Sequence, residues 1–243
     1  MEATPEISLA AEQIASLGGF PITNSLLLSG LVTVFIIIMS WVIRYQVALV
    51  PAGFYNAVES VVEGLFNLAE SVFGNFEEAK RYFPIIAALF LFILLNNWAG
   101  LMPGVGPITS GHVPLLRGGT ADLNTTLALA IISVGITQYY AMARLGFFGN
   151  VGRFINLKNP ILFFVGILEL VAEFAKVLSF SFRLFGNIFA GEVLLVVMAF
   201  LAPYLAPLPF IGLELFVGLV QALVFAMLTL VFLKVAVAES HNT

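Results

Sequence analysis

The chain has 243 residues, of which 60% are hydrophobic and only 10% are charged, and its formal net charge is −4. A soluble domain of this size would carry about 25% charged residues, so the composition indicates an all-α integral membrane protein with one domain, residues 1–243. The acidic balance argues against nucleic acid as a partner. The chain has no cysteine and only two histidines, both outside the apolar runs, so we expect neither a disulfide nor a metal site or cofactor.

The first apolar run, residues 25–43, is long enough to cross a bilayer and is followed by Arg44. We expect residues 1–24 to be an external segment. Residues 51–78 differ, because their glutamates fall within about 40° of one another on a helix and apolar side chains fill the opposite arc. These glutamates are Glu59, Glu63, Glu70 and Glu77. The pattern predicts an amphipathic helix at the membrane interface. Its acidic stripe favours docking against a partner subunit over a plain solvated face.

Residues 82–101, 122–145 and about 209–238 are further predicted crossings. Asp122 or Asn124 can cap the start of the middle one. The apolar stretch 161–201 holds 41 residues without proline, or about 62 Å of helix against about 30 Å of hydrocarbon. It either breaks near Gly186 and Asn187 into two crossings or remains one helix inclined about 60° from the membrane normal.

Basic residues in the connecting segments indicate the orientation. Seven of them share one side if there are five crossings with the N-terminus outside: Arg44, Lys80, Arg81, Arg144, Arg153, Lys158 and Lys234. Only Arg117 then falls outside. Two crossings in place of the long helix would move Lys234 outside, so we prefer one strongly tilted helix and a cytoplasmic C-terminus.

Arg183 lies inside the long apolar stretch. A cation at bilayer depth costs roughly 2.5–3.5 kcal/mol, and arginine stays protonated when it is desolvated. Five polar residues fall within about 80° on one face of this helix: Glu169, Glu173, Lys176, Arg183 and Asn187. Glu192 lies about 180° from Arg183, and Glu214 and Gln221 share a face of the last helix. This pattern suggests ion handling, with polar groups that divide two wet spaces.

Simpler structural roles remain open for these residues. Glu173 and Lys176, three residues apart, are expected to form an ion pair. Arg183 could be a buried partner of Glu169 or Glu214. On that interpretation the arginine would only hold helices together in a membrane scaffold.

Four motifs carry a resemblance to a known family. Residues 181–192 read Ser-Phe-Arg-Leu-Phe-Gly-Asn-Ile-Phe-Ala-Gly-Glu, and residues 219–230 read Leu-Val-Gln-Ala-Leu-Val-Phe-Ala-Met-Leu-Thr-Leu. Upstream are Asn-Asn-Trp-Ala-Gly-Leu-Met-Pro-Gly at 96–104 and Ala-Asp-Leu-Asn-Thr-Thr-Leu at 121–127. In order and spacing the chain resembles subunit a of the F-type ATP synthase.

The resemblance implies the stator half of a proton turbine that contains no nucleotide site and is not itself an enzyme. It implies two long tilted helices over 161–238 that face the c-ring, with the essential arginine at Arg183 between two offset half-channels. Positions matching the external half-channel and the arginine's surroundings are Asn187, Glu192, Glu214 and Gln221. Positions matching the cytoplasmic exit are Glu169 and Ser179. Implied partners are the c-ring, the b subunits of the peripheral stalk, the soluble F1 head and the lipid bilayer.

One departure concerns Glu192 and Glu214. Many family members place a histidine at one of the two matching positions, whereas this chain has glutamate at both. Two nearby carboxylates titrate as a coupled pair and can serve proton uptake without histidine. The expected location is a bacterial cell membrane, with a plastid or mitochondrial membrane as the alternative. The competing function is a secondary transporter that binds substrate at Arg183, although the sequence shows no internal repeat of the kind common in transporters.

Overall fold

The computed structural model describes residues 11–17, 19–45, 53–102, 105, 109–110, 113–146, 160–202 and 205–238. Within these ranges the chain forms six α-helices: α1 (Asn24–Tyr45), α2 (Phe54–Phe73), α3 (Phe76–Gly100), α4 (Leu123–Leu145), α6 (Pro160–Leu201) and α7 (Pro207–Ala238). All except α2 are long and apolar enough to cross a membrane. The helical membrane fold with five crossings is therefore confirmed. Arg153 and Lys158, counted above among the basic residues, lie outside the described residues.

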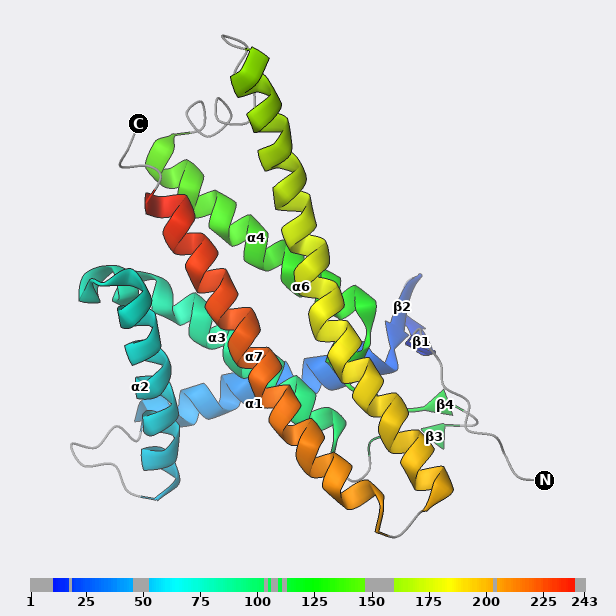
Figure 1. Ribbon diagram of the computed structural model, residues 1–243. Helices are drawn as coiled ribbons and strands as arrows, with labels where there is room; N and C mark the ends of the chain where they lie inside the picture. Colours follow the sequence, from blue (N-terminus) through cyan, green and yellow to red (C-terminus); the bar gives the residue numbers. More distant parts are fainter. Residues whose placement is uncertain are drawn as a thin grey trace.

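Helices α6 and α7 run side by side and are joined at one end, with α3 and α4 packed against them (Figure 1). The core between these four helices is apolar and includes Ile86 and Ile93 of α3, Leu184 of α6 and Leu230 of α7, all almost fully buried. By contrast, α1 buries only part of its first half and exposes large apolar side chains such as Ile37 and Trp41. Apolar outward faces of this kind are stable in hydrocarbon rather than in water.

The long apolar stretch is one uninterrupted helix. α6 spans 42 residues from Pro160 to Leu201 and passes through Gly186 and Asn187 without a break. At 1.5 Å per residue it extends about 63 Å. The alternative of two crossings that meet near Gly186 is therefore wrong, because the helix continues through this glycine.

The amphipathic segment is shorter than predicted. Gly74 has φ 72°, a left-handed conformation that ends α2, and its N–H donates to Glu70 O. Asn75 then caps α3, its Oδ1 accepting from Glu77 N at 2.9 Å. The prediction of one helix over residues 51–78 is thus wrong at its end, and Glu77 belongs to the first turn of α3 instead of the acidic stripe. The rest of α2 is amphipathic, with Leu65 and Ala69 buried against α3.

Two short antiparallel hairpins were not predicted from the helical patterns. β1 (Gln13–Leu17) pairs with β2 (Phe20–Thr23), and β3 (Thr109–Ser110) pairs with β4 (Val113–Pro114). The first hairpin leads directly into α1, where Glu12 and Asn24 exchange backbone and side-chain hydrogen bonds of 3.1 and 3.2 Å. A 3₁₀ turn, η1 (Gly119–Ala121), precedes α4. Asp122 then caps α4, as predicted, by accepting from Asn124 N at 3.1 Å.

Candidate functional site

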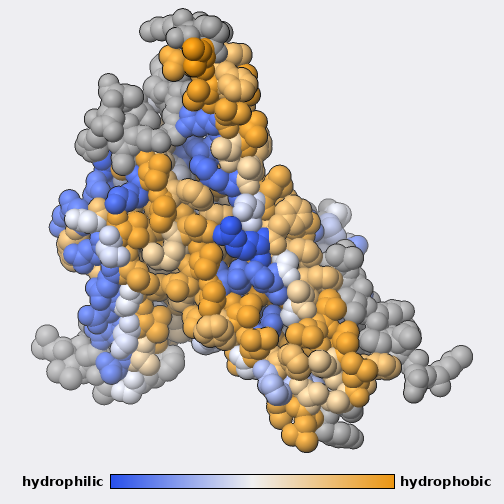
Figure 2. Space-filling view, in the orientation of Figure 1, coloured by the Kyte–Doolittle hydropathy of each residue, from blue (hydrophilic) through white to orange (hydrophobic). Residues whose placement is uncertain are grey.

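Arg183 projects from the middle of α6 and its side chain is exposed. Its guanidinium Nη2 donates to Ser179 Oγ at 3.3 Å, one turn earlier on the helix. One turn later, Asn187 Nδ2 donates to the backbone oxygen of Arg183 at 2.9 Å. Gln221 of α7 lines the same small crevice as Arg183. Figure 2 shows hydrophilic atoms in the middle of this face, surrounded by hydrophobic ones.

The alternative in which Arg183 is a buried partner of Glu169 or Glu214 is wrong. Within the described ranges Arg183 makes no ion pair, and its side chain is exposed. Glu214 is instead buried at another place, beside α6 (6% exposed). The positive charge of Arg183 therefore lies at the surface of the described part of the chain.

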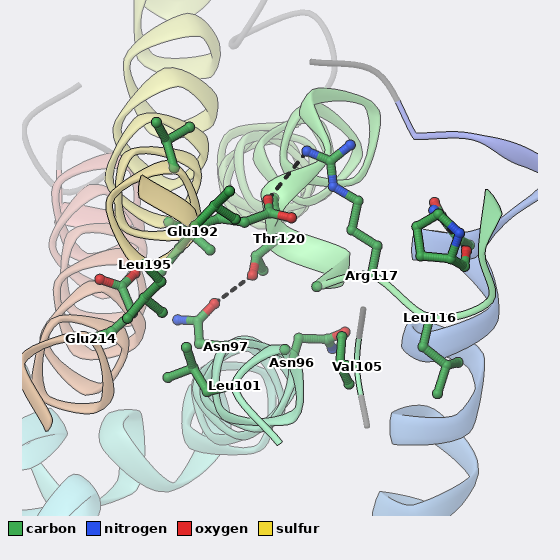
Figure 3. A pocket seen from close by; sticks show the side chains of 18 of the residues that line it. Asn96, Asn97, Leu101, Val105, Leu116, Arg117, Thr120, Glu192, Leu195 and Glu214 are labelled. Carbon is green, nitrogen blue, oxygen red and sulfur yellow. Dashed lines mark hydrogen bonds and ion pairs between the residues drawn. The ribbon is translucent and has the colours of Figure 1, made fainter. Parts of the chain in front are cut away.

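A cavity of about 310 Å³ lies between α3, η1, α6 and α7. Its α6 lining, from Ile188 to Val196, lies in the half of the helix between Arg183 and Leu201. Its polar lining includes Asn96, Asn97, Arg117, Thr120, Glu192 and Glu214, several of which point toward one another in Figure 3. The structure thus brings Glu192 and Glu214, predicted from two different helices, to one cavity.

An ion pair crosses this cavity. Arg117 Nη2 donates to Glu192 Oε2 at 3.2 Å, drawn as a dashed line in Figure 3. The Arg117 side chain is only 8% exposed, whereas that of Glu192 is 38% exposed. From the sequence, Arg117 was expected only as a charge outside the membrane, because no local pattern links two residues 75 positions apart.

Glu214 packs on a glycine. A Cβ atom built at Gly191 would lie 2.0 Å from Cδ and from both carboxylate oxygens of Glu214. Such a distance is far inside van der Waals contact, so the carboxylate occupies the space that any larger residue would fill. Oε1 of Glu214 is buried and has no hydrogen-bond partner among the described residues.

Buried hydrogen bonds attach the wall of the cavity to its neighbours. Asn97 of α3 donates from Nδ2 to the carbonyl of Gly218 on α7 at 2.8 Å and accepts from Thr120 Oγ1 at 2.6 Å. A Cβ at Gly218 would lie 3.0 Å from Asn97 Cβ, so the glycine permits this close approach. The role of Asn97 and Thr120 as positioning residues was not predicted from the sequence. The available signal was a pair of asparagines inside an otherwise apolar run.

On the other side of Arg183, toward Pro160, α6 carries Glu169, Glu173, Lys176 and Ser179. Glu173 and Lys176 form the predicted ion pair. Hydrophilic atoms continue along this part of the α6 face in Figure 2. Polar residues therefore lie on both sides of the central arginine along the helix.

Comparison with known proteins shows the family of this chain. The family model described as ATP synthase A chain matches residues 26–234. The chain belongs to this family. The chain is 34% identical to ATP synthase subunit a of Geobacter sulfurreducens over 214 residues, which cover 87% of this chain and 86% of that protein. It is 35% identical to ATP synthase subunit a of Campylobacter jejuni over 217 residues, covering 87% of this chain and 90% of that protein.

Membership in the ATP synthase A chain family confirms the resemblance found in the sequence motifs. Together with the five candidate spans, it identifies a multi-pass membrane protein of the rotary ATP synthase, with a role in the membrane-embedded sector. The matched region includes α6 and most of α7, and hence Arg183, Glu192, Glu214 and Gln221. The individual roles of these residues remain predictions.

Proposed function

We propose that this chain is the proton-translocating stator subunit of its ATP synthase, with Arg183 separating two half-channels at the surface facing a c-ring. The observation that carries the proposal is the exposed position of Arg183 in the middle of α6, without an ion-pair partner among the described residues. In a membrane, an arginine that is exposed in this way faces hydrocarbon and is desolvated, and it is stable there only where an opposite charge can reach it. A rotor carboxylate would supply that charge.

The external half-channel corresponds to the cavity lined by Arg117, Glu192 and Glu214. Asn187 and Gln221 connect this cavity with the surroundings of Arg183. Asn187 lies one turn after the arginine on α6, and Gln221 of α7 lines the same crevice as Arg183. The cytoplasmic half-channel follows the opposite half of α6, past Ser179 and Glu169. The two paths are offset along the helix, so a proton cannot pass straight through.

The mechanism follows from charge in a medium of low dielectric. A rotor carboxylate must be neutral while it faces lipid, because an unpaired charge there is unfavourable. Beside Arg183 the ionised form is favoured, so the proton leaves toward the cytoplasmic exit. A proton arriving through the external cavity then neutralises the carboxylate, and the ring advances. Each proton crossing the membrane potential supplies about 2.3 kcal/mol per 100 mV.

An arrangement with the N-terminus outside and the C-terminus in the cytoplasm is supported by a cluster of charges at one end of the helix bundle. Arg144 of α4 pairs with Glu78 of α3 at 3.0 Å. Lys234 of α7 donates to Val72 O at the end of α2, at 2.5 Å. Basic residues favour the cytoplasmic side, while Arg117 lies at the opposite end. Because α6 extends about 63 Å, it would cross a core of about 30 Å strongly tilted, as one arm of a hairpin with α7.

This function assigns partners and a location. The c-ring would lie against the exposed face of α6 and α7, and peripheral-stalk b subunits would hold the chain stationary. The soluble F1 head would make ATP, since this chain carries no nucleotide-binding motif and serves as a conducting subunit. The bacterial relatives favour a bacterial cell membrane.

The decisive experiment replaces Arg183 by alanine in the complete ATP synthase. We expect proton-driven ATP synthesis to fall to background while the subunit still inserts and assembles, because the substituted side chain is exposed and packs little. ATP synthesis in energised membrane vesicles is measured per assembled complex. Normal coupled synthesis in Arg183→Ala membranes would exclude the proposed function.

A further inference from the structure

The half of α6 between Pro160 and Arg183 carries a continuous polar row. Its members are Glu169, Glu173, Lys176, Ser179 and Arg183. The successive spacings are four, three, three and four residues, so each member is the surface neighbour of the next, about 5–6 Å apart at Cβ. Hydrogen bonds join two of the neighbouring pairs, Lys176 with Glu173 and Arg183 with Ser179. The row therefore links the central arginine to the Pro160 end of the helix.

Within this row, Glu173 has one carboxylate oxygen paired and one free. Oε1 accepts from Lys176 Nζ, whereas Oε2 is buried and accepts no hydrogen bond from the described residues. The Glu173 side chain is only 14% exposed. A buried oxygen without a donor is unfavourable, which a purely structural ion pair on one helix would not require. The same oxygen is well suited to accept a proton.

Lys176 is held in place by the neighbouring helix. Its Nζ lies 4.8 Å from the centre of the Phe232 ring on α7, in a cation–π contact. Phe232 in turn stacks on Phe180 of α6 at 5.6 Å between ring centres. Because the lysine is fixed on two sides, its ammonium group remains beside the Glu173 carboxylate.

We propose that Glu173 is a proton-carrying residue of the path between Arg183 and the cytoplasm, and that Lys176 is its positioning residue. This inference rests on the function proposed above. A proton released beside Arg183 travels through water to Oε2 of Glu173, which becomes a neutral carboxyl and loosens its contact with Lys176. The proton then passes to water at the Pro160 end, near Glu169, and the ion pair forms again. Glu173 lies ten residues from Arg183, about 15 Å along the helix axis, so it divides the path into shorter steps.

The test uses the complete ATP synthase reconstituted in lipid vesicles, with the variants Glu173→Gln, Glu173→Asp, Lys176→Gln and the double variant Glu173→Gln/Lys176→Gln. Proton flux through the membrane sector is measured under a potassium diffusion potential after the soluble head is removed. It is expressed per assembled complex. A matched control comes from α3, where Glu77 and Lys80 have the same three-residue spacing and Lys80 also lies over a phenylalanine, Phe76. Both control residues are exposed.

Removing a positioned proton carrier slows transfer by roughly 10²-fold when nothing replaces it. Because water bypasses part of the step, we expect Glu173→Gln to lower proton flux about tenfold. Glu173→Asp should recover most of it. Lys176→Gln should have a smaller effect, and the double variant should be no slower than Glu173→Gln, because Lys176 acts through Glu173. Glu77→Gln and Lys80→Gln should match the unsubstituted protein.

The double variant keeps the test decisive if the single variants assemble poorly, since it removes both charges together. Normal flux per complex in the double variant would overturn the proposal and leave the pair a structural contact only. Normal flux in Glu173→Gln would overturn it as well. Arg183→Ala, tested in parallel, distinguishes failure of the stator function from failure of the role of Glu173. If Arg183→Ala loses coupled synthesis while Glu173→Gln has normal proton flux, only the role of Glu173 is refuted. Coupled synthesis that survives Arg183→Ala refutes the stator function itself.

Discussion

The carboxylate of Glu214 on α7 lies directly against the backbone of Gly191 on α6. The space that a Cβ of residue 191 would fill is occupied by this carboxylate, with both of its oxygens 2.0 Å from the ideal Cβ position. Gly191 is one residue before Glu192, which faces the same cavity. A glycine thus allows two carboxylates from different helices to line one small space.

Gly191→Ala should displace the Glu214 carboxylate or separate α6 from α7. We expect proton-driven ATP synthesis to fall by roughly tenfold or more, since a displacement of about 1 Å at a reacting group can cost 10²-fold. Initial rates in energised vesicles measure the effect. Gly135→Ala on α4 is the matched control, because nothing lies within 4 Å of its Cβ position. Equal rates in the two variants would contradict the steric role of Gly191.

Arg183→Lys keeps the positive charge but should not restore coupled synthesis. The ammonium group is a compact, strongly hydrated point charge, whereas guanidinium is planar and more weakly hydrated. We expect less than about a tenth of the normal synthesis rate, a barrier increase of at least about 1.4 kcal/mol. Assembly, followed by the amount of complex recovered from the membrane, should be unchanged. A lysine variant that supports normal synthesis would show that charge alone is sufficient.

Arg117→Gln removes the partner of Glu192 across the cavity. Breaking a fully buried pair costs roughly 3–5 kcal/mol, but Glu192 is 38% exposed, so we expect roughly 1–3 kcal/mol. The thermal midpoint of the purified complex should fall accordingly. In the double variant Arg117→Gln/Glu192→Gln much of the stability should return, because no carboxylate is left without its partner. Additive losses in the double variant would mean that the two side chains do not interact.

Asn97→Ala should destabilise the contact between α3 and α7. The substitution leaves the Gly218 carbonyl and the Thr120 hydroxyl without the partners found at 2.8 and 2.6 Å. The expected loss is about 1–2 kcal/mol, because hydrogen bonds between membrane helices contribute modestly. It is measured by thermal inactivation of ATP-driven proton pumping. Asn56→Ala on the exposed face of α2 provides the control, and a loss of the same size there would argue against the bridging role.

Single cysteines test the external position of the cavity in this naturally cysteine-free chain. Cysteine at position 192 or 214 should react with a membrane-impermeant thiol reagent added outside, since both positions line the cavity. Position 192 should react faster, because Glu192 is 38% exposed on its side chain and Glu214 is buried. A cysteine in place of Lys80 should react only from the cytoplasmic side. Labelling of position 192 from the cytoplasm alone would reverse the assignment of the two half-channels.

Local sequence patterns determined the membrane class, the number of crossings and the unbroken helix through Arg183. The membrane class depends on the length and hydropathy of single segments, which the tertiary structure does not alter. The preference for one helix over two came from the distribution of basic residues along the chain. The cap at Asp122 and the ion pair of Glu173 with Lys176 were also predictable, because both join residues within one turn of a helix. The early end of the amphipathic helix also had a local signal, because a glycine followed by asparagine at Gly74 and Asn75 is typical of a helix end. The prediction followed the spacing of the glutamates and continued the helix past it.

Only the tertiary structure decided which distant residues share the cavity. The pairs Arg117 with Glu192, Glu214 with Gly191 and Asn97 with Gly218 join segments 23 to 121 positions apart. Such pairs depend on how helices rotate and slide against one another, and small residues decide how closely the backbones approach. The periodicity of one helix shows which residues share its face, but it carries no information about the residue opposite. For that reason the sequence indicated the polar residues of the site individually, and helix packing determined their partners.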